Sequence, residues 1–580
     1  MTAGFEVPDR AEGAAETSGN SFRQDPFILE TRGWSALATD CEPKLFAIAS
    51  LANLGTPDPV ASVSYRSQGN VLVIAGASAE RARRCAHELA ADLHVTLLDH
   101  EFVAAPAVTS WRGEVRSLSG FLGEFTAEVA LDGAAARPAK FDLVLDFSSP
   151  PLFPMRQPPQ GYRAAPADDG SLAQVLDELR EAVGEFEKPR FFAYRENICA
   201  HSRSQVAGCS RCIDICSTQA IASDGDHVSV DPHLCMGCGA CATVCPSGAM
   251  SYQYPRVADR GAQMKQLLSS YRKAGGADAC IVFHDGNAGR ALLESAAASG
   301  QGLPARALPL EAWHSASIGL DLLLPAIAFG ASHVVVIAGD ADREYVHALR
   351  EQMAIGQSIL GGLGYAGTHF AVVEARDGLS LEAAFGALEP TGVPPVTGTF
   401  MLGNDKRTAI EFAVEHLARH APAPATEIAL PAGAPFGEVR VDRDKCTMCM
   451  ACVGSCPESA LMDGVDQPLL KFLERNCVQC GLCESTCPEN AITLSPRLLL
   501  TPQVREARVV NQTEPFHCVS CGKAFGTRQI VQSMLGRLAG HSMFAGEGAL
   551  RRLQMCGDCR VVDMMASKSE VSVLKLGADS

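Results

Sequence analysis

The chain has 580 residues and a formal net charge of −17, so it is too long for one hydrophobic core and should fold into several domains. The negative charge argues against nucleic acid and anionic membrane surfaces as partners. Its 23 cysteines are not spaced like those of a disulfide-stabilised secreted protein. The polar N-terminal residues lack the apolar segment of a signal peptide, and no uninterrupted apolar stretch predicts a membrane span. We therefore expect a cytoplasmic protein whose reduced thiols bind metal.

The first third of the sequence alternates between strand and helix patterns after a polar start. Residues 1–30 are predicted to be disordered, and residues 31–150 are predicted to form a Rossmann-like α/β domain. Within this domain, residues 71–93 predict a buried strand followed by an amphipathic helix. The turn between them contains Gly76 but no G-x-G-x-x-G pattern, so it does not predict a dinucleotide site. The proline-rich stretch at 151–189 is predicted to be a linker.

Most of the cysteines fall in two modules, at residues 190–256 and 438–498. Three cysteine runs in them match the pattern C-x2-C-x2-C-x3-C-P. Three cysteines on one tight loop can reach three corners of an iron–sulfur cubane, whereas the fourth ligates the neighbouring cluster. Zinc sites rarely use this spacing followed by proline, so zinc or disulfides are the weaker alternatives. The complete runs are Cys235, Cys238, Cys241 and Cys245; Cys446, Cys449, Cys452 and Cys456; and Cys477, Cys480, Cys483 and Cys487.

One further run, in the first module, departs from the pattern. Cys209, Cys212 and Cys216 supply its last three positions, with Ser217 in place of proline. The first position must come from Cys199, on the far side of a nine-residue stretch. All four runs nevertheless place an alanine four residues after the last cysteine, which indicates an internal fourfold repeat. A three-iron cluster, or no cluster, is the alternative for this run.

Crossed ligation within each module predicts four [4Fe–4S] clusters. Cluster one takes Cys199, Cys209, Cys212 and Cys245, and cluster two takes Cys235, Cys238, Cys241 and Cys216. Cluster three takes Cys446, Cys449, Cys452 and Cys487, and cluster four takes Cys477, Cys480, Cys483 and Cys456.

A second predicted α/β domain at residues 262–420 separates the two modules, and a linker rich in proline and alanine follows at 421–437. Beyond the second module, the segment 510–565 carries two CxxC pairs. Four thiolates on two tight turns predict a closed, structural zinc site of the zinc-ribbon type. A fifth iron–sulfur cluster or a redox-active dithiol is the alternative. The predicted zinc ligands are Cys518, Cys521, Cys556 and Cys559.

The cysteine runs resemble those of two-cluster bacterial ferredoxins. The whole arrangement, with PPQGY at 158–162 before the first module, also resembles large polyferredoxin-type proteins that proteobacteria encode beside formate dehydrogenases. The motif GASHVVVIAGD at 330–340 is similar to the iron–sulfur delta-type domain found with heterodisulfide reductases. Of that domain's cluster cysteines only Cys280 remains here, so the additional cluster is expected to be absent. These resemblances imply an α/β multidomain protein in which α+β ferredoxin-like modules alternate with Rossmann-like domains.

These observations predict an electron carrier rather than an enzyme that transforms a substrate, since no catalytic constellation is visible. The carrier would relay single electrons between a low-potential dehydrogenase and an acceptor, and the resemblance implies formate dehydrogenase as the partner. The alternatives are a flavin- or NAD-linked oxidoreductase subunit and an assembly factor for a metallo-dehydrogenase.

Overall fold

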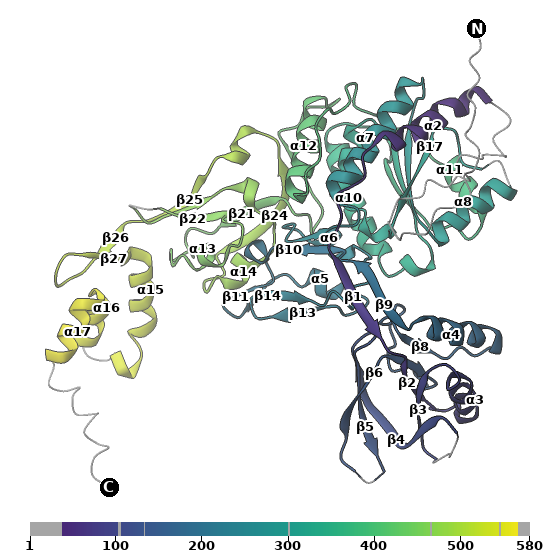
Figure 1. Ribbon diagram of the computed structural model, residues 1–580. Coiled ribbons are helices and arrows are strands. Elements are labelled where there is room, and N and C mark those ends of the chain that lie inside the picture. Colours follow the sequence, from purple (N-terminus) through teal and green to yellow (C-terminus); the bar gives the residue numbers. More distant parts are fainter. Residues whose placement is uncertain are drawn as a thin grey trace.

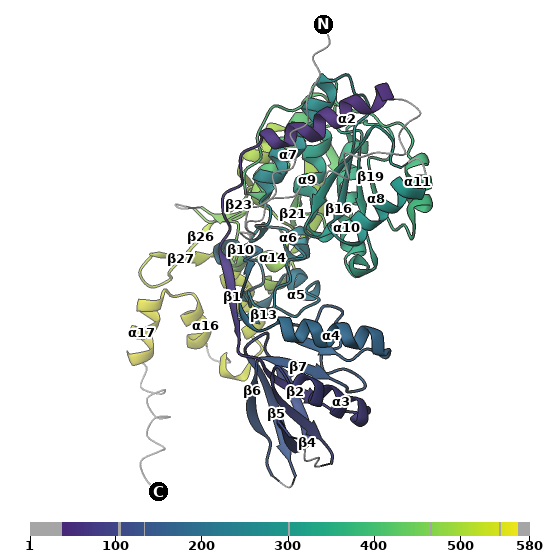
Figure 2. The same ribbon diagram turned by 45° about the vertical axis from the view of Figure 1, so that its right-hand side comes forward.

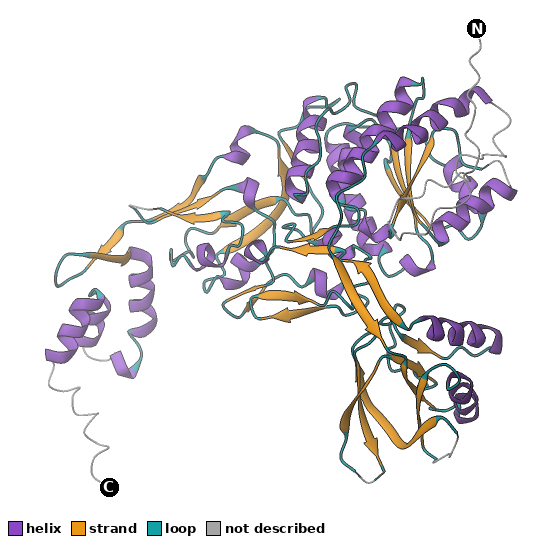
Figure 3. Ribbon diagram, viewed as in Figure 1, coloured by secondary structure: helices purple, strands orange, loops and turns teal. Residues whose placement is uncertain are grey.

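The computed structural model describes residues 38–101, 106–132, 134–299, 302–464, 467–544 and 547–566. The predicted disorder of residues 1–30 lies outside these ranges. Helices and strands are mixed throughout the described chain (Figure 3). In Figure 1 the first ferredoxin module lies between the central α/β domain above and the N-terminal α/β domain below, and the second module leads to a small C-terminal unit on the left. Among the helices within those ranges, none combines the length and apolar character needed to cross a membrane.

The N-terminal domain is built on a seven-stranded sheet with the strand order β6-β5-β4-β3-β2-β7-β8. The five neighbouring strands β4, β3, β2, β7 and β8 run parallel to one another. Strands β5 and β6 continue the sheet from β4 as an antiparallel hairpin. Helices α3 and α4 cover one face with their apolar stripes. The elements are β2 (Asn70–Ile74), α3 (Ala79–Leu89), β3 (His94–Asp99), β4 (Val108–Ser119), β5 (Phe125–Leu131), β6 (Arg137–Phe141), β7 (Leu143–Asp146), β8 (Tyr162–Ala164) and α4 (Asp169–Glu181).

Regular structure fills much of the stretch 151–189 that was predicted as a linker. Strand β8 extends the sheet, and α4 packs Leu172, Leu176 and Leu179 into the core at helical spacing. The Asp168 side chain caps α4 by accepting the Ser171 backbone N–H at 2.7 Å. Strand β9 (Gly184–Pro189) then pairs antiparallel with β1 (Ser62–Ser67). This two-stranded arm leads from the N-terminal domain to the first module (Figure 1).

The central domain is a parallel four-stranded sheet with the order β17-β16-β18-β19 and helices on both faces. Alternate strand residues enter separate cores, as expected for a sheet buried on both sides. The elements are α7 (Val257–Lys273), β16 (Cys280–Asp285), α8 (Ala288–Ser299), β17 (Ala307–Ala312), α9 (Leu320–Ala328), β18 (His333–Ile337), α10 (Val346–Gly362), β19 (Phe370–Val373), α11 (Gly378–Gly386) and α12 (Lys406–Arg419).

Two details of the central domain differ from the sequence-based boundaries. Helix α2 (Ala38–Ser50) falls within the predicted N-terminal domain but packs Ala47 and Ile48 against α7 in the central core. Cys280 is fully buried among apolar side chains on the face covered by α8 and α11. Its burial fits a structural role for this thiol.

The two modules share one pattern, in which an outer strand pair encloses an inner pair and two short helices. The first contains β10 (Phe192–Tyr194), β11 (Ser202–Arg203), β12 (Val206–Ala207), α5 (Arg211–Asp214), β13 (Ile221–Asp224), β14 (His227–Val230), α6 (Ala240–Val244) and β15 (Met250–Tyr252). The second contains β21 (Gly437–Val441), α13 (Ala451–Ser455), β22 (Leu461–Asp463), β23 (Leu469–Phe472), α14 (Leu482–Thr486) and β24 (Ile492–Leu499). Strand β20 (Glu427–Ala429), inside the predicted linker 421–437, pairs with β24, and β25 (Arg508–Gln512) pairs with β23.

The C-terminal unit combines one hairpin with helices. Strands β26 (Pro515–His517) and β27 (Ala524–Thr527) form the hairpin, followed by α15 (Arg528–Leu538), α16 (Glu547–Leu553) and α17 (Gly557–Ala566). The first CxxC pair lies in the hairpin turn. The second pair lies at the start of α17 rather than in the second tight turn that the sequence predicted, because the residues after Gly557 continue as a helix.

Candidate iron–sulfur and metal sites

The three complete cysteine runs wind in the same way because two residues in each adopt left-handed backbone conformations. These lie two and four positions after the first cysteine. They are Gly237 and Gly239 (φ 81° and 79°), Met448 and Met450 (58° and 62°), and Gln479 and Gly481 (53° and 86°). Methionine thus takes the same conformation as glycine, so the left-handed turn, rather than a small side chain, is what the loop requires. At Gly237 glycine is also sterically required, since a Cβ would lie 2.6 Å from the Phe191 ring.

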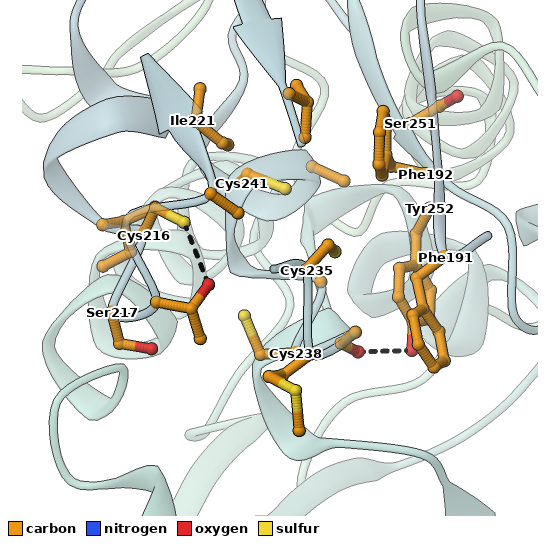
Figure 4. A pocket seen from close by; sticks show the side chains of 18 residues that line it. Phe191, Phe192, Cys216, Ser217, Ile221, Cys235, Cys238, Cys241, Ser251 and Tyr252 are labelled. Carbon is orange, nitrogen blue, oxygen red and sulfur yellow. Dashed lines mark hydrogen bonds between the residues drawn. The ribbon is translucent and has the colours of Figure 1, made fainter. Parts of the chain in front are cut away.

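The four ligands predicted for cluster two line one pocket, and the four predicted for cluster four line another. Cys216, Cys235, Cys238 and Cys241 surround one pocket (Figure 4). Cys456, Cys477, Cys480 and Cys483 surround another. In both, the last cysteine of one run lies beside the first three of its partner run. The structure therefore brings together the cysteines that crossed ligation pairs.

The remaining two sets of cysteines also lie together. Burial, and then the neighbouring Cys245, Cys209 and Cys199, raise the pKa of Cys212 to about 12. These are the other three residues predicted to bind cluster one. Burial and the neighbouring Cys446, Cys449 and Cys487 raise the pKa of Cys452 to about 12 in the same way, and these complete the set for cluster three.

The chemistry of these sites fits an iron–sulfur cluster. Burial raises the pKa of Cys480 to about 12 and that of Cys238 to about 11. Thiols packed in this way would not ionise together in the absence of positive charge. The ferric and ferrous ions of a cubane supply that charge and take thiolates as ligands.

In three of the cysteine runs, a backbone N–H four or five residues after the last cysteine donates to the sulfur of that cysteine. The Ala460 backbone N–H donates to Cys456 Sγ at 3.2 Å, and the Ala491 N–H donates to Cys487 Sγ at 3.3 Å. In the first module, Met250 N–H donates to Cys245 Sγ at 3.4 Å instead. Hydrogen bonds to a ligand sulfur stabilise the reduced cluster and raise its potential.

Sequence reasoning did not find Tyr345, which contributes to the surroundings of cluster two from the start of α10. Its hydroxyl forms hydrogen bonds with the Ser217 hydroxyl and with the Cys238 thiol. Ser217 is the residue that replaces the usual proline, so this departure from the pattern was the available signal. The partner lies 128 residues away in the central domain, which local patterns cannot reveal.

Two buried lysines hold the backbone around the first module's ligands. Lys188 Nζ donates to the carbonyls of His233 and Cys235 at 2.7 and 2.8 Å. Lys406 Nζ donates to the carbonyls of Ala242, Thr243 and Cys245 at 2.8, 2.7 and 3.1 Å. Both lysines come from outside the module, Lys188 from the β1–β9 arm and Lys406 from α12. They place positive charge close to two ligand loops.

The C-terminal cysteines form a more compact group than the cluster ligands. All four sulfurs of Cys518, Cys521, Cys556 and Cys559 lie within 4.8 Å of one another, and Cys521 and Cys556 are 3.7 Å apart. A tetrahedral zinc with bonds of about 2.3 Å places its sulfurs about 3.8 Å apart, so one ion fits this group. Burial alone would raise the pKa of Cys518, but three backbone N–H groups lower it to about 6. Hydrogen bonds with the neighbouring thiols, first of all Cys521, raise the pKa of Cys559 to about 12.

Comparisons with known proteins give matches inside both cysteine modules. Residues 207–249 match one 4Fe–4S dicluster domain and residues 445–492 match another. A stretch of 52 residues is 38% identical to hydrogenase-4 component A of Escherichia coli (strain K12), covering 9% of this chain and 25% of that protein. A stretch of 42 residues is 36% identical to a "Ferredoxin 7Fe" of Hydrogenibacillus schlegelii, covering 7% of this chain and 54% of that ferredoxin.

The chain therefore spans a quarter of the length of one of these relatives and about half of the other. Both dicluster-domain matches lie within the two cysteine modules. Within those limits the chain carries two segments that match 4Fe–4S dicluster domains, which supports a role in iron–sulfur electron transfer.

Proposed function

We propose that this chain relays single electrons through four [4Fe–4S] clusters, two in each module. The observation that carries the proposal is the crossed grouping of the cysteines, in which the last cysteine of each run lies with the first three of the other. The ligands of each cluster are those assigned by crossed ligation, from Cys199 to Cys487. Each bound cluster would accept and release one electron, while the protein sets its potential through hydrogen bonds and burial.

The four C-terminal cysteines would hold one structural zinc ion. Their compact spacing supports zinc over a fifth cubane, and four protein ligands leave no open position for chemistry. Thr527 at the end of the hairpin donates its hydroxyl proton to the Thr447 carbonyl at 3.0 Å, inside the ligand loop of cluster three. The zinc would therefore support the surroundings of that cluster.

The electron donor or acceptor would be a low-potential metalloenzyme. The polyferredoxin resemblance favours a formate dehydrogenase, and the similarity to a hydrogenase component favours a hydrogenase of related chemistry. The net charge of −17 favours a basic docking patch on the partner. Co-purification from the native host under anoxic conditions, followed by mass spectrometry, identifies the partner.

Iron counting tests the clusters and their crossed ligation. Anaerobically prepared protein should contain about sixteen irons and show paramagnetic centres on reduction. A Cys216→Ala/Cys235→Ala variant removes two ligands of one crossed cluster and should lose about four irons, whereas Cys235→Ala/Cys245→Ala should lose about eight. Ligation within single runs predicts the opposite order for the two variants. Cys85→Ala, far from either module, is the control, and an iron-free wild-type protein would refute the proposal.

A further inference from the structure

The stretch that interrupts the first cysteine run is a well-defined hairpin. Residues 200–208 form β11 and β12, joined by Ser204 and Gln205 with φ of 52° and 68°. Two backbone hydrogen bonds of 2.8 Å close its base, from Gly208 N–H to His201 O and from Cys209 N–H to Ala200 O. Asp226 accepts the Ser202 hydroxyl at 3.0 Å and so fixes one strand. The unusual spacing between Cys199 and Cys209 thus encodes a rigid projection.

This hairpin contacts the other module. Strand β12 lies against α14, and a Cβ placed on Gly208 would stand 2.7 Å from the Leu482 side chain. Leu482 is fully buried and lies between two predicted ligands of cluster four. Figures 1 and 2 both show α14 beside the first module's elements, although the two regions are far apart in sequence. Glycine at position 208 therefore allows both the close approach of the two modules and the closure of the hairpin, since a Cβ would also lie 2.5 Å from the Ala200 carbonyl oxygen.

The contact brings cluster one next to cluster four. Gly208 directly precedes Cys209, a predicted ligand of cluster one, and the Leu482 side chain that it faces lies between Cys480 and Cys483, two predicted ligands of cluster four. Within the modules, α5 packs against α6 and α13 packs against α14, and these helices carry Cys212, Cys241, Cys452 and Cys483 of clusters one, two, three and four in turn. Each step in the order two, one, four, three thus joins ligands that are close in space.

The central domain fixes this arrangement through consecutive residues of α12. Lys406 bonds three carbonyls of the first module. Arg407 donates to the Arg475 carbonyl of the second module at 2.6 Å. Arg211 of the first module also donates to the Gly433 carbonyl, just before the second module, at 3.0 Å. The contact between the two modules is therefore held by α12 and by Arg211 as well as by the hairpin.

We infer that the two modules form one continuous electron path in the order cluster two, one, four, three, and that the hairpin at 200–208 is the joint that couples them. The inference rests on the proposed four-cluster function and adds its connectivity. Two separate two-cluster carriers on one chain would need no such contact. If the modules were two separate carriers, the contact between the hairpin at 200–208 and α14 would have no role in electron transfer.

Magnetic coupling between reduced clusters tests the path. In a variant that keeps clusters one and four only (Cys216→Ala/Cys235→Ala with Cys446→Ala/Cys487→Ala), we expect resolved dipolar broadening in the electron paramagnetic resonance spectrum. The matched variant with clusters two and three only (Cys199→Ala/Cys245→Ala with Cys456→Ala/Cys477→Ala) should show none. Stronger coupling in the second variant, or equal coupling in both, would overturn the order.

The role of the hairpin is tested in the variant that holds clusters one and four. Replacing residues 200–208 by two residues, which restores C-x2-C spacing, should abolish the broadening while iron content stays constant. Gly208→Val should weaken it, because the new side chain meets both Leu482 and the Ala200 carbonyl at the base of the hairpin. Replacing Ser204–Gln205 by Asn–Gly keeps the turn and should preserve the coupling. Unchanged coupling in the shortened variant would overturn the role of the hairpin at 200–208. Failure of the wild-type chain to bind iron would instead refute the proposed four-cluster function.

Discussion

Substituting Lys406 by methionine should lower the reduction potential of cluster one. The Lys406 side chain is only 6% exposed, and its three carbonyl acceptors use three N–H donors, which identifies the charged ammonium form. One of those carbonyls belongs to Cys245, a predicted ligand. At an effective dielectric constant of about 20, a unit charge about 7 Å from the added electron contributes about 2.4 kcal/mol. This corresponds to about 100 mV for a one-electron couple.

A redox titration followed by electron paramagnetic resonance measures this shift. Methionine fills most of the same volume but leaves three carbonyls without a donor, so we also expect a stability loss of about 3 kcal/mol. Lys265→Met is the matched control, since Lys265 also donates to backbone carbonyls but from α7, where it contacts Thr399, Phe400 and Met401. An Lys406→Met protein with full iron content and unchanged potentials would contradict the electrostatic argument.

Three further predictions concern other parts of the chain. Tyr345→Phe removes a hydroxyl that bonds a cluster-two ligand, so the potential of that cluster should fall in the same titration. Cys521→Ala should abolish zinc binding without changing iron content, as measured by elemental analysis. Burial lowers the pKa of His284, His333 and His369 below the usual 6.5. The unfolded chain then binds more protons, so the free energy of unfolding should fall as the pH drops below about 6.5, as denaturant titration will reveal.

Cysteine spacing predicted which cysteines lie together because the geometry that matters is local. A loop such as Cys235–Cys241 presents its sulfurs through its own backbone turns, and its partner cysteine lies in the same module. Proline content was misleading at 151–189, where the amphipathic spacing of Leu172, Leu176 and Leu179 was the stronger signal. The boundary near residue 31 failed for a different reason, since only tertiary packing assigns α2 to the central core.

The surroundings of the clusters were not predictable from the sequence, because they depend on contacts between domains. Lys406 lies 161 residues from Cys245, and nothing in its local pattern distinguishes it from a solvent-exposed helix residue. Likewise, the sequence shows the nine residues before Cys209 only as a departure from the repeat pattern. Their contact with α14 depends on how the two modules pack together, which local sequence does not encode.

Exposure distinguishes the two ends of the inferred electron path. Of the sixteen predicted cluster ligands, all lie in described parts of the chain, and Cys449 of cluster three is the exposed one. At the other end, the β1–β9 arm reaches the loop of cluster two through Lys188, and α10 covers it through Tyr345. Electron transfer between proteins slows steeply with distance, so a partner exchanges electrons most rapidly with the cluster nearest the surface. The proposed partner would therefore dock at cluster three, beside the hairpin that carries the zinc ligands.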